Sequence, residues 1–291
     1  MASVLAGGFA DVPIDAAHTF RAALQAMARP GRIEQVEVPT RLLTGIQAVE
    51  YVRAFLIGRV GWNGLGGNLI ISGAFGLFSR DALMEIGGYE HESIGEDMEL
   101  VVRLRRQGYE SKRGARVVFS PDPVAWTEAP EDIRSLARQR NRWQRGLLDV
   151  LVRHRRMVLN PRYRSAGMLA MPYFVLVEAL APILEATGLI LLAAGLLLGW
   201  YSTGVLISVA VVMAAGIVTT ILTLLLDDVT FRTYQGGSAR LRLIGYAILE
   251  QLVYRPCTLV WRVWGTWLFL RGRGEWGVQR RQGMTVETAA A

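Results

Sequence analysis

The chain has 291 residues, a formal net charge of +7 and a single cysteine, Cys257. This length allows one or two domains, and one cysteine excludes both a disulfide framework and a cysteine-ligated metal site. Hydrophobic residues make up 52% of the chain and the mean hydropathy is +0.28. Because the apolar residues are concentrated in the C-terminal half, the composition favours a membrane-associated protein over an ordinary soluble domain.

The first forty residues differ from those that follow. Asp15 is placed to cap a helix that runs to about Met27, and Pro30-Gly31 ends it. A short strand is predicted over residues 33–38. No signal peptide is predicted, because no basic segment precedes a long apolar run.

Residues 42–130 have the pattern of an α/β domain. The predicted order is a helix over 42–56 ending near Gly58, a strand over 68–71 continued by small residues to 78, a helix from Ser79 to Gly87-Gly88, a helix over 96–107 ended by Gly108, and a strand over 117–119.

Residues 131–160 are predicted to contain a long basic helix. Positions 134–156 hold eight arginines against one acidic residue, Asp149. An apolar stripe from Leu136 through Trp143 to Leu151 lies opposite the arginines, which is typical of a helix in a membrane interface. We expect no nucleic-acid partner, because no zinc-finger, RNA-binding or homeodomain pattern accompanies the basic block.

The membrane region is predicted over residues 168–270. The runs 168–199 and 203–226 are long enough to cross a bilayer, which takes roughly 20 residues. Their connection is uncharged and their flanks are basic, so we expect both flanks to be cytoplasmic. Residues 243–270 are interrupted by charges and predict two amphipathic pieces joined at Tyr254-Arg255-Pro256, before a basic tail over 271–291.

Two acidic residues, Glu178 and Glu185, fall inside the first predicted span. Acids in a span are costly and usually face a bundle interior or a polar path. They fit a route for product, a structural pair near the interface, or partners of arginines from the basic helix.

Gly95-Glu96-Asp97 stands at the start of the predicted helix over 96–107. A carboxylate at such a position can serve as a general base, and Asp97 is the candidate. The alternative is that Glu96 and Asp97 only cap the helix and offset its dipole.

A second motif, Gln139-Arg140-Asn141-Arg142-Trp143, lies on the basic helix. Gln139, Arg142 and Trp143 share one face because they are three and four residues apart. Arginine suits bidentate contacts with phosphate, and an indole can stack on a sugar ring. The alternative is an interfacial helix with a buried tryptophan and solvated arginines.

Together the two motifs resemble those of membrane-embedded family 2 glycosyltransferases, such as the synthases of cellulose, chitin and hyaluronan. The resemblance covers about residues 42–291. It implies that Asp97 is the base, that Gln139 and Arg142 hold the donor's pyrophosphate, and that Trp143 is a platform for the acceptor sugar. The other matching positions, expected to contribute to donor or acceptor binding, are Ser72, Gly73, Glu96 and Arg140. For Ser72-Gly73-Ala74, a tight strand-to-helix connection is the alternative.

The implied fold is the C-terminal part of a GT-A-like catalytic domain, followed by the interfacial helix and a membrane helix hairpin. The implied reaction moves a sugar from a nucleotide sugar to a polysaccharide or glycolipid, at the cytoplasmic side of a bacterial inner membrane. A divalent metal, Mg or Mn, is expected in the family, but its Asp-x-Asp ligands are missing between Met1 and Trp62. We therefore expect the chain to lack the donor half and to be inactive alone.

Residues 7–33, with the run Ala28-Arg29-Pro30-Gly31-Arg32-Ile33, resemble the start of the H subunit of the carbon–phosphorus lyase system. We interpret residues 1–40 as a foreign leader. Two alternatives to a transferase remain. One is a non-catalytic membrane protein, either a remnant or an assembly partner. The other is a phosphonate-metabolism component, an interpretation that rests on residues 1–38 alone.

Overall fold

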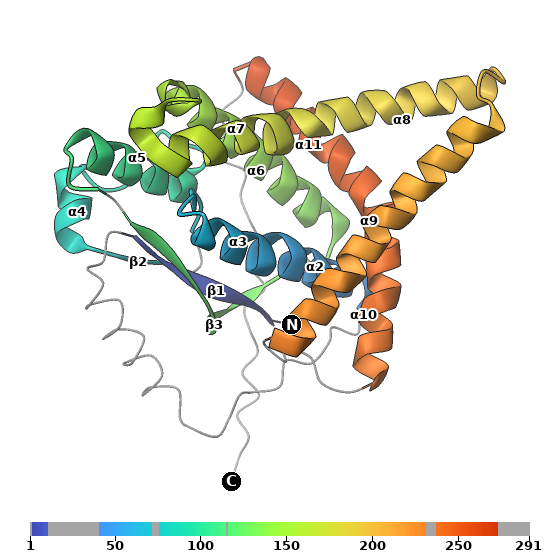
Figure 1. The fold of residues 1–291 in the computed structure, drawn as a ribbon, viewed down its shortest axis with the longest axis horizontal. Coiled ribbons are helices and arrows are strands. Elements are labelled where there is room, and N and C mark those ends of the chain that lie inside the picture. Colours follow the sequence, from blue (N-terminus) through green and yellow to red (C-terminus); the bar gives the residue numbers. More distant parts are fainter. Residues whose placement is uncertain (1, 11–40, 72–75, 115, 231–236, 273–291) are drawn as a thin grey trace, which may run out of the picture.

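The computed structural model describes residues 2–10, 41–71, 76–114, 116–230 and 237–272. A small sheet lies under a layer of helices, and two long helices project from this body as arms (Figure 1).

The sheet has three strands, β1 (Ala2–Ala10), β2 (Gly76–Phe78) and β3 (Val117–Glu128), in the order β2-β1-β3. The central strand β1 is parallel to β2 and antiparallel to β3. The sequence did not predict β1, and the interpretation of this segment as a foreign leader gave no reason to expect it at the centre of a sheet. The strand predicted over 33–38 lies outside the described residues.

The prediction of a strand over residues 68–71 is wrong. Within the described chain this segment joins no sheet. Leu69 is buried among side chains of the helices α5 (Glu96–Glu110) and α6 (Ile133–Arg153). Ile71 is buried between α5 and Val117 of β3. The apolar run therefore reflects burial in the core, which produces continuous apolar sequences whether or not the segment is a strand.

The first helical stretch is longer than predicted. It consists of α2 (Leu42–Tyr51), the π-helical segment η1 (Val52–Ile57) and α3 (Gly58–Gly64), so it passes through Gly58 without a break. The turn after it contains Gly66, which has a φ of +62°. A glycine ends a helix when it takes this left-handed conformation, and Gly58 does not.

Three further helices complete the α/β region. They are α4 (Arg80–Glu85), α5 (Glu96–Glu110) and α6 (Ile133–Arg153). Ser79 caps α4, since its Oγ accepts a hydrogen bond from the backbone N–H of Ala82, and Asp132 caps α6 by accepting from Ser135. Helix α5 continues through Gly108, which the sequence predicted to end it.

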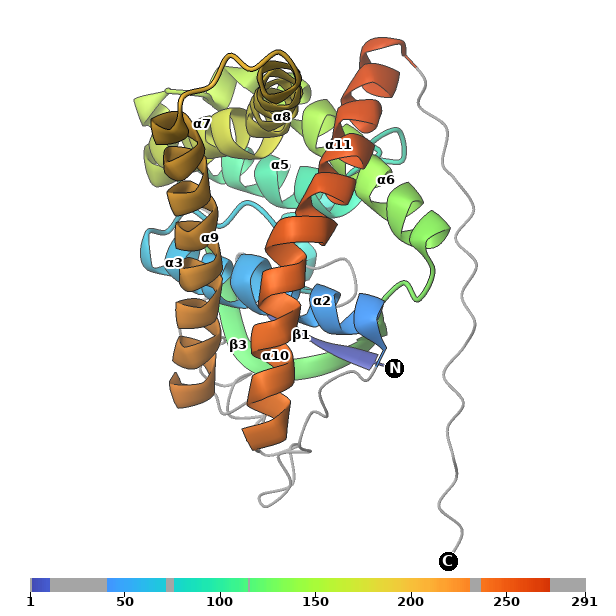
Figure 2. The same ribbon diagram turned by 90° about the vertical axis from the view of Figure 1, so that its right-hand side faces the viewer.

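Helix α6 is covered by protein along its apolar stripe. Leu136 and Leu151 are buried, whereas Trp143 is 37% exposed. α6 lies against α11 (Arg255–Leu270), which is the second of two helices after the arms (Figure 2). The first of them, α10 (Gly237–Leu249), packs beside α2 and α9 (Thr203–Thr230).

Short helical turns connect α6 to the first arm. They are η2 (Arg155–Met157), η3 (Pro161–Tyr163), η4 (Ala166–Ala170), α7 (Met171–Tyr173) and η5 (Phe174–Leu180), and the arm itself is α8 (Ala181–Leu197). The π-helical segment η6 (Glu250–Tyr254) joins α10 to α11, at the place where the sequence predicted a joint.

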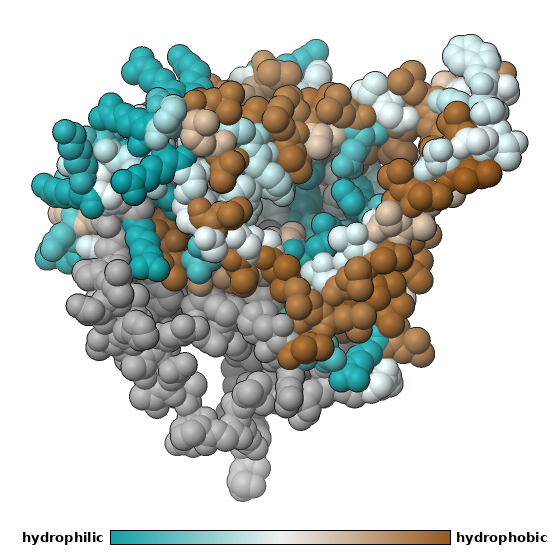
Figure 3. Space-filling model, viewed as in Figure 1, coloured by the Kyte–Doolittle hydropathy of each residue, from teal (hydrophilic) through white to brown (hydrophobic). Residues whose placement is uncertain are grey.

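Two helical stretches, Ala166–Leu197 and Thr203–Val229, are long and apolar enough to cross a membrane. They overlap the two predicted spans and contain the arms α8 and α9, whose surface is rich in apolar side chains (Figure 3). Polar side chains gather on the opposite part of the same view, over α4 and α5.

Candidate functional site

The start of α5 crosses α6 with backbone against backbone. Gly95 is the residue before the first helical position of α5, and Gly146 lies two-thirds of the way along α6. A β-carbon on Gly95 would lie 3.0 Å from the carbonyl oxygen of Gly146, and one on Gly146 would lie 3.0 Å from the Gly95 α-carbon. Glycine at both positions therefore permits this close approach.

The crossing joins the helix that begins at the first sequence motif to the helix that carries the second. Gln139, Arg142 and Gly146 are spaced by three and four residues, so they follow one stripe of α6. At 1.5 Å rise per residue, Arg142 lies about 6 Å and Gln139 about 10 Å along the axis from the crossing. Asp97 is two residues beyond Gly95, in the first turn of α5.

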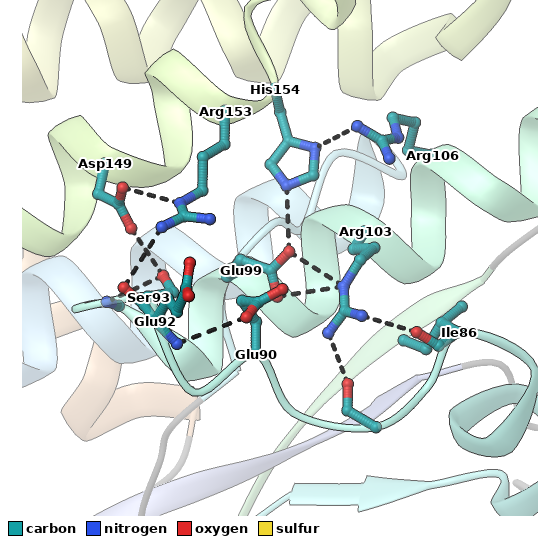
Figure 4. Close-up of polar contacts among 12 residues, drawn as sticks. Ile86, Glu90, Glu92, Ser93, Glu99, Arg103, Arg106, Asp149, Arg153 and His154 are labelled. Atoms are coloured by element: carbon teal, nitrogen blue, oxygen red, sulfur yellow. Dashed lines mark hydrogen bonds and ion pairs between the residues drawn. The ribbon is translucent and has the colours of Figure 1, made fainter.

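Hydrogen bonds to α6 hold the loop that leads into α5 (Figure 4). The Ser93 hydroxyl donates to Asp149 Oδ2 at 2.9 Å, and Arg153 Nε donates to Asp149 Oδ1 at 2.8 Å. Arg153 also donates to the carbonyl oxygen of Glu92 at 3.3 Å. Since Ser93 is fully buried, the residues just before Gly95 are fixed relative to α6.

A second polar contact between the two helices lies one turn further along α5. Glu99 Oε1 is 3.4 Å from Nε2 of the buried His154, and Arg103 Nε is 3.0 Å from the same oxygen (Figure 4). Arg106 Nη1 lies 3.2 Å from His154 Nδ1. Burial alone would raise the pKa of Glu99, but the hydrogen bond with His154 and the charge of Arg103 outweigh it and lower that pKa.

Two residues that the sequence did not single out lie within electrostatic reach of Asp97. Burial lowers the pKa of Arg59, on α3, to about 10, and the negative charge of Asp97 opposes this shift. Burial also raises the pKa of Tyr89, with the charges of Asp97 and Glu96 adding to the effect. Neither residue belongs to a motif or a periodic pattern, so only the folded chain associates them with Asp97.

Asp97 also takes part in the local structure of the helix start. Its Oδ1 accepts a hydrogen bond from the backbone N–H of Met98 at 2.8 Å. This contact supports the interpretation that the motif stabilises the start of the helix.

Arg140 differs from the other motif residues because its side chain turns into the protein. It is 4% exposed and donates from Nη2 to Glu50 Oε2 at 2.5 Å and to the Tyr254 hydroxyl at 2.9 Å. Its guanidinium carbon lies 4.2 Å from the centre of the Trp143 ring.

Gln144 follows Trp143 in the sequence and belongs to a polar cluster between α6, α11 and η5. Its amide donates to the Thr266 hydroxyl at 3.1 Å and accepts from Arg262 Nε at 2.9 Å. Arg262 also lies 3.2 Å from Glu178, and Arg255 lies 3.4 Å from Glu185. Glu178 and Glu185, the acids of the first predicted span, thus pair with arginines of α11. The expected pairing with arginines of the basic helix α6 is not observed.

The divalent metal expected from the family has no candidate ligand cluster among the described residues. Glu96 and Asp97 are the paired carboxylates at the crossing, and no group of three histidine, cysteine or acidic side chains occurs within the described ranges. Ser72 and Gly73 lie outside the described residues.

Comparison with known proteins places the chain in a family. The sequence profile of glycosyl transferase family group 2 matches residues 18–226. The poly-beta-1,6-N-acetyl-D-glucosamine synthases of Staphylococcus aureus (strain COL) and Staphylococcus epidermidis are 33% and 35% identical to this chain over 114 residues.

The aligned segment is 38% of this chain and 26% of each relative, so the match spans about a quarter of the curated relatives' length. No solved structure matches the chain with comparable significance. The profile nevertheless covers well over half of the 291 residues. The chain therefore belongs to glycosyl transferase family group 2.

Proposed function

We propose that this chain carries the acceptor side of a membrane glycosyltransferase that extends a polysaccharide from a nucleotide sugar. The observation that carries the proposal is the close approach of Gly95, two residues before Asp97, to Gly146 of the helix that also carries Gln139 and Arg142. The names of the relatives, which are synthases of a β-1,6-linked N-acetylglucosamine polymer, support a glycan acceptor.

In the proposed reaction, Asp97 takes the proton of an acceptor hydroxyl as its oxygen attacks the anomeric carbon of the donor. The bond from that carbon to the diphosphate breaks, and the electron pair leaves with the diphosphate. Arg142 and Gln139 hold the departing group through charge-assisted and neutral hydrogen bonds. Trp143, which is 37% exposed, offers a ring face on which the acceptor sugar stacks.

The donor side is a separate part of the proposal. No Asp-x-Asp sequence occurs among the 291 residues, and the described carboxylates do not gather into a metal site. We therefore propose that transfer needs an Asp-x-Asp-bearing segment in addition to these residues. The alternative function is a non-catalytic membrane protein, which the membrane helices alone would also suit.

The two functions differ in glycan binding. We expect the detergent-solubilised chain to bind a β-1,6-linked N-acetylglucosamine hexasaccharide in isothermal titration calorimetry. Trp143→Ala should abolish this binding, because the stacking surface is lost, whereas Asp97→Asn should retain it. Absence of binding, or binding that is indifferent to Trp143→Ala, would favour the non-catalytic alternative.

A further inference from the structure

We infer that Arg140 is a positioning residue that holds the Trp143 indole in place, and that it does not itself contact donor or acceptor. This inference rests on the proposed function in one respect, since it takes Trp143 to be the acceptor platform. It assigns a role different from the ligand contact that the sequence motif suggested for Arg140.

The first observation is a closed triangle of hydrogen bonds among three elements. Arg140 of α6 donates to Glu50 of α2 and to Tyr254 of η6, and the Tyr254 hydroxyl donates to the same Glu50 oxygen at 2.8 Å. These three residues are 90, 114 and 204 positions apart in the chain. The triangle therefore ties the motif helix to two elements that belong to no motif.

Burial excludes Arg140 from easy contact with a ligand. The side chains of Arg140 and Tyr254 are each 4% exposed, and that of Glu50 is 18% exposed. The Nε atom of Arg140 is buried and has no hydrogen-bond partner within the described residues. A ligand would have to break a buried ion pair to reach this guanidinium, at the high cost of leaving a buried charge uncompensated.

Electrostatics keep this guanidinium charged. Burial on its own would lower the pKa of Arg140, but the charge of Glu50 and the two nearby tyrosines outweigh it and raise that pKa. The permanent cation lies 4.2 Å from the centre of the Trp143 ring and 6.0 Å from that of Tyr51. Attraction between a cation and a ring face orients the indole, so the triangle fixes the ring through Arg140.

The same helix offers a matched control. Arg138 is two residues before Arg140, is exposed, and donates to the Ser135 hydroxyl at 2.9 Å. It shares the charge and the helix but not the triangle. Arg138→Met should therefore leave the Trp143 ring undisturbed.

The decisive experiment compares Arg140→Met, Glu50→Gln and their double variant by calorimetry with the β-1,6-linked N-acetylglucosamine hexasaccharide. We expect each single variant to weaken binding about tenfold, and the double variant to be no weaker than Arg140→Met, because both changes release the same ring. A direct ligand role for Arg140 predicts that Glu50→Gln binds normally. That result would overturn the inference. Tyr254→Phe, which removes only one hydroxyl, repeats the test should Glu50→Gln fail to fold.

A second readout needs no ligand. With 5-fluorotryptophan incorporated, the Trp143 fluorine resonance can be assigned by its loss in Trp143→Phe. It should shift in Arg140→Met and Glu50→Gln but not in Arg138→Met. An unchanged resonance in both triangle variants would overturn the inference. If the resonance shifts but the chain binds no hexasaccharide, the acceptor role fails while the positioning of Trp143 by Arg140 stands.

Discussion

At the scale of single residues, Glu99 shows how a charged group near the candidate site is stabilised. It is 3% exposed and is contacted by both His154 and Arg103. These contacts favour the carboxylate over the protonated acid, so they lower the pKa of Glu99 in the folded protein. In the unfolded chain the carboxyl returns to its ordinary pKa near 4.5.

This difference predicts a pH dependence of stability. A lowered folded pKa contributes stability that is fully present above about pH 4.5 and is lost as the pH falls through the folded value. Thermal unfolding between pH 7 and pH 3 should therefore show a fall in Tm that is smaller in Glu99→Gln. Glu85→Gln, at an exposed ion pair with Arg113, should keep the wild-type profile. Identical profiles for Glu99→Gln and the wild type would contradict the assignment.

At the scale of elements, the crossing of α5 and α6 positions the candidate site. The backbones meet at Gly95 and Gly146, and the loop before α5 is fixed by Ser93 and Asp149. The first turn of α5 thus has a defined place relative to the motif helix. By contrast, β2 has three residues and pairs only with β1 among the described strands.

Gly146→Ala should test this crossing. The added methyl group would press on the Gly95 backbone at 3.0 Å, so the helices must separate by a few tenths of an ångström. Overpacking of this kind costs about 1–3 kcal/mol, and we expect Tm to fall accordingly. Gly61→Ala is the control, because a β-carbon there meets nothing within 4 Å. Equal Tm values for the two variants would show that the crossing is not tight.

At the scale of the whole molecule, the exposed arms α8 and α9 and the arginine-rich helix α6 suggest an orientation. We propose that the connection between the arms is extracytoplasmic and that α6 is cytoplasmic, following the excess of arginine on the flanks.

Cysteine labelling should reveal this orientation. In a Cys257→Ser background, a cysteine replacing Ser202, between the arms, should react with an impermeant maleimide in intact spheroplasts. A cysteine replacing Arg138 should react only after the inner membrane is permeabilised. The reverse pattern would refute the proposed orientation.

The proposed need for an Asp-x-Asp-bearing segment gives the second test at this scale. Purified chain with a nucleotide sugar and Mg should form no product, whereas a chimera that gains the Asp-x-Asp-bearing half of a complete relative should be active. Asp97→Asn should lower the rate of the chimera at least about 100-fold, because loss of a general base has this effect. Near-full activity of that variant would rule out Asp97 as base, and turnover by the unaltered chain would rule out the need for a second segment.

The sequence by itself determined the features that depend on nearby residues. The two apolar runs are contiguous, the helix start at Ser79 depends on a backbone group three residues away, and the family motifs are read in order. Only the tertiary structure decided that Gly58 continues a helix and that Leu69 and Ile71 are buried without joining the described sheet. It also decided that Arg140 turns inward, because Glu50 and Tyr254 are 90 and 114 positions away and meet it only when the chain has folded.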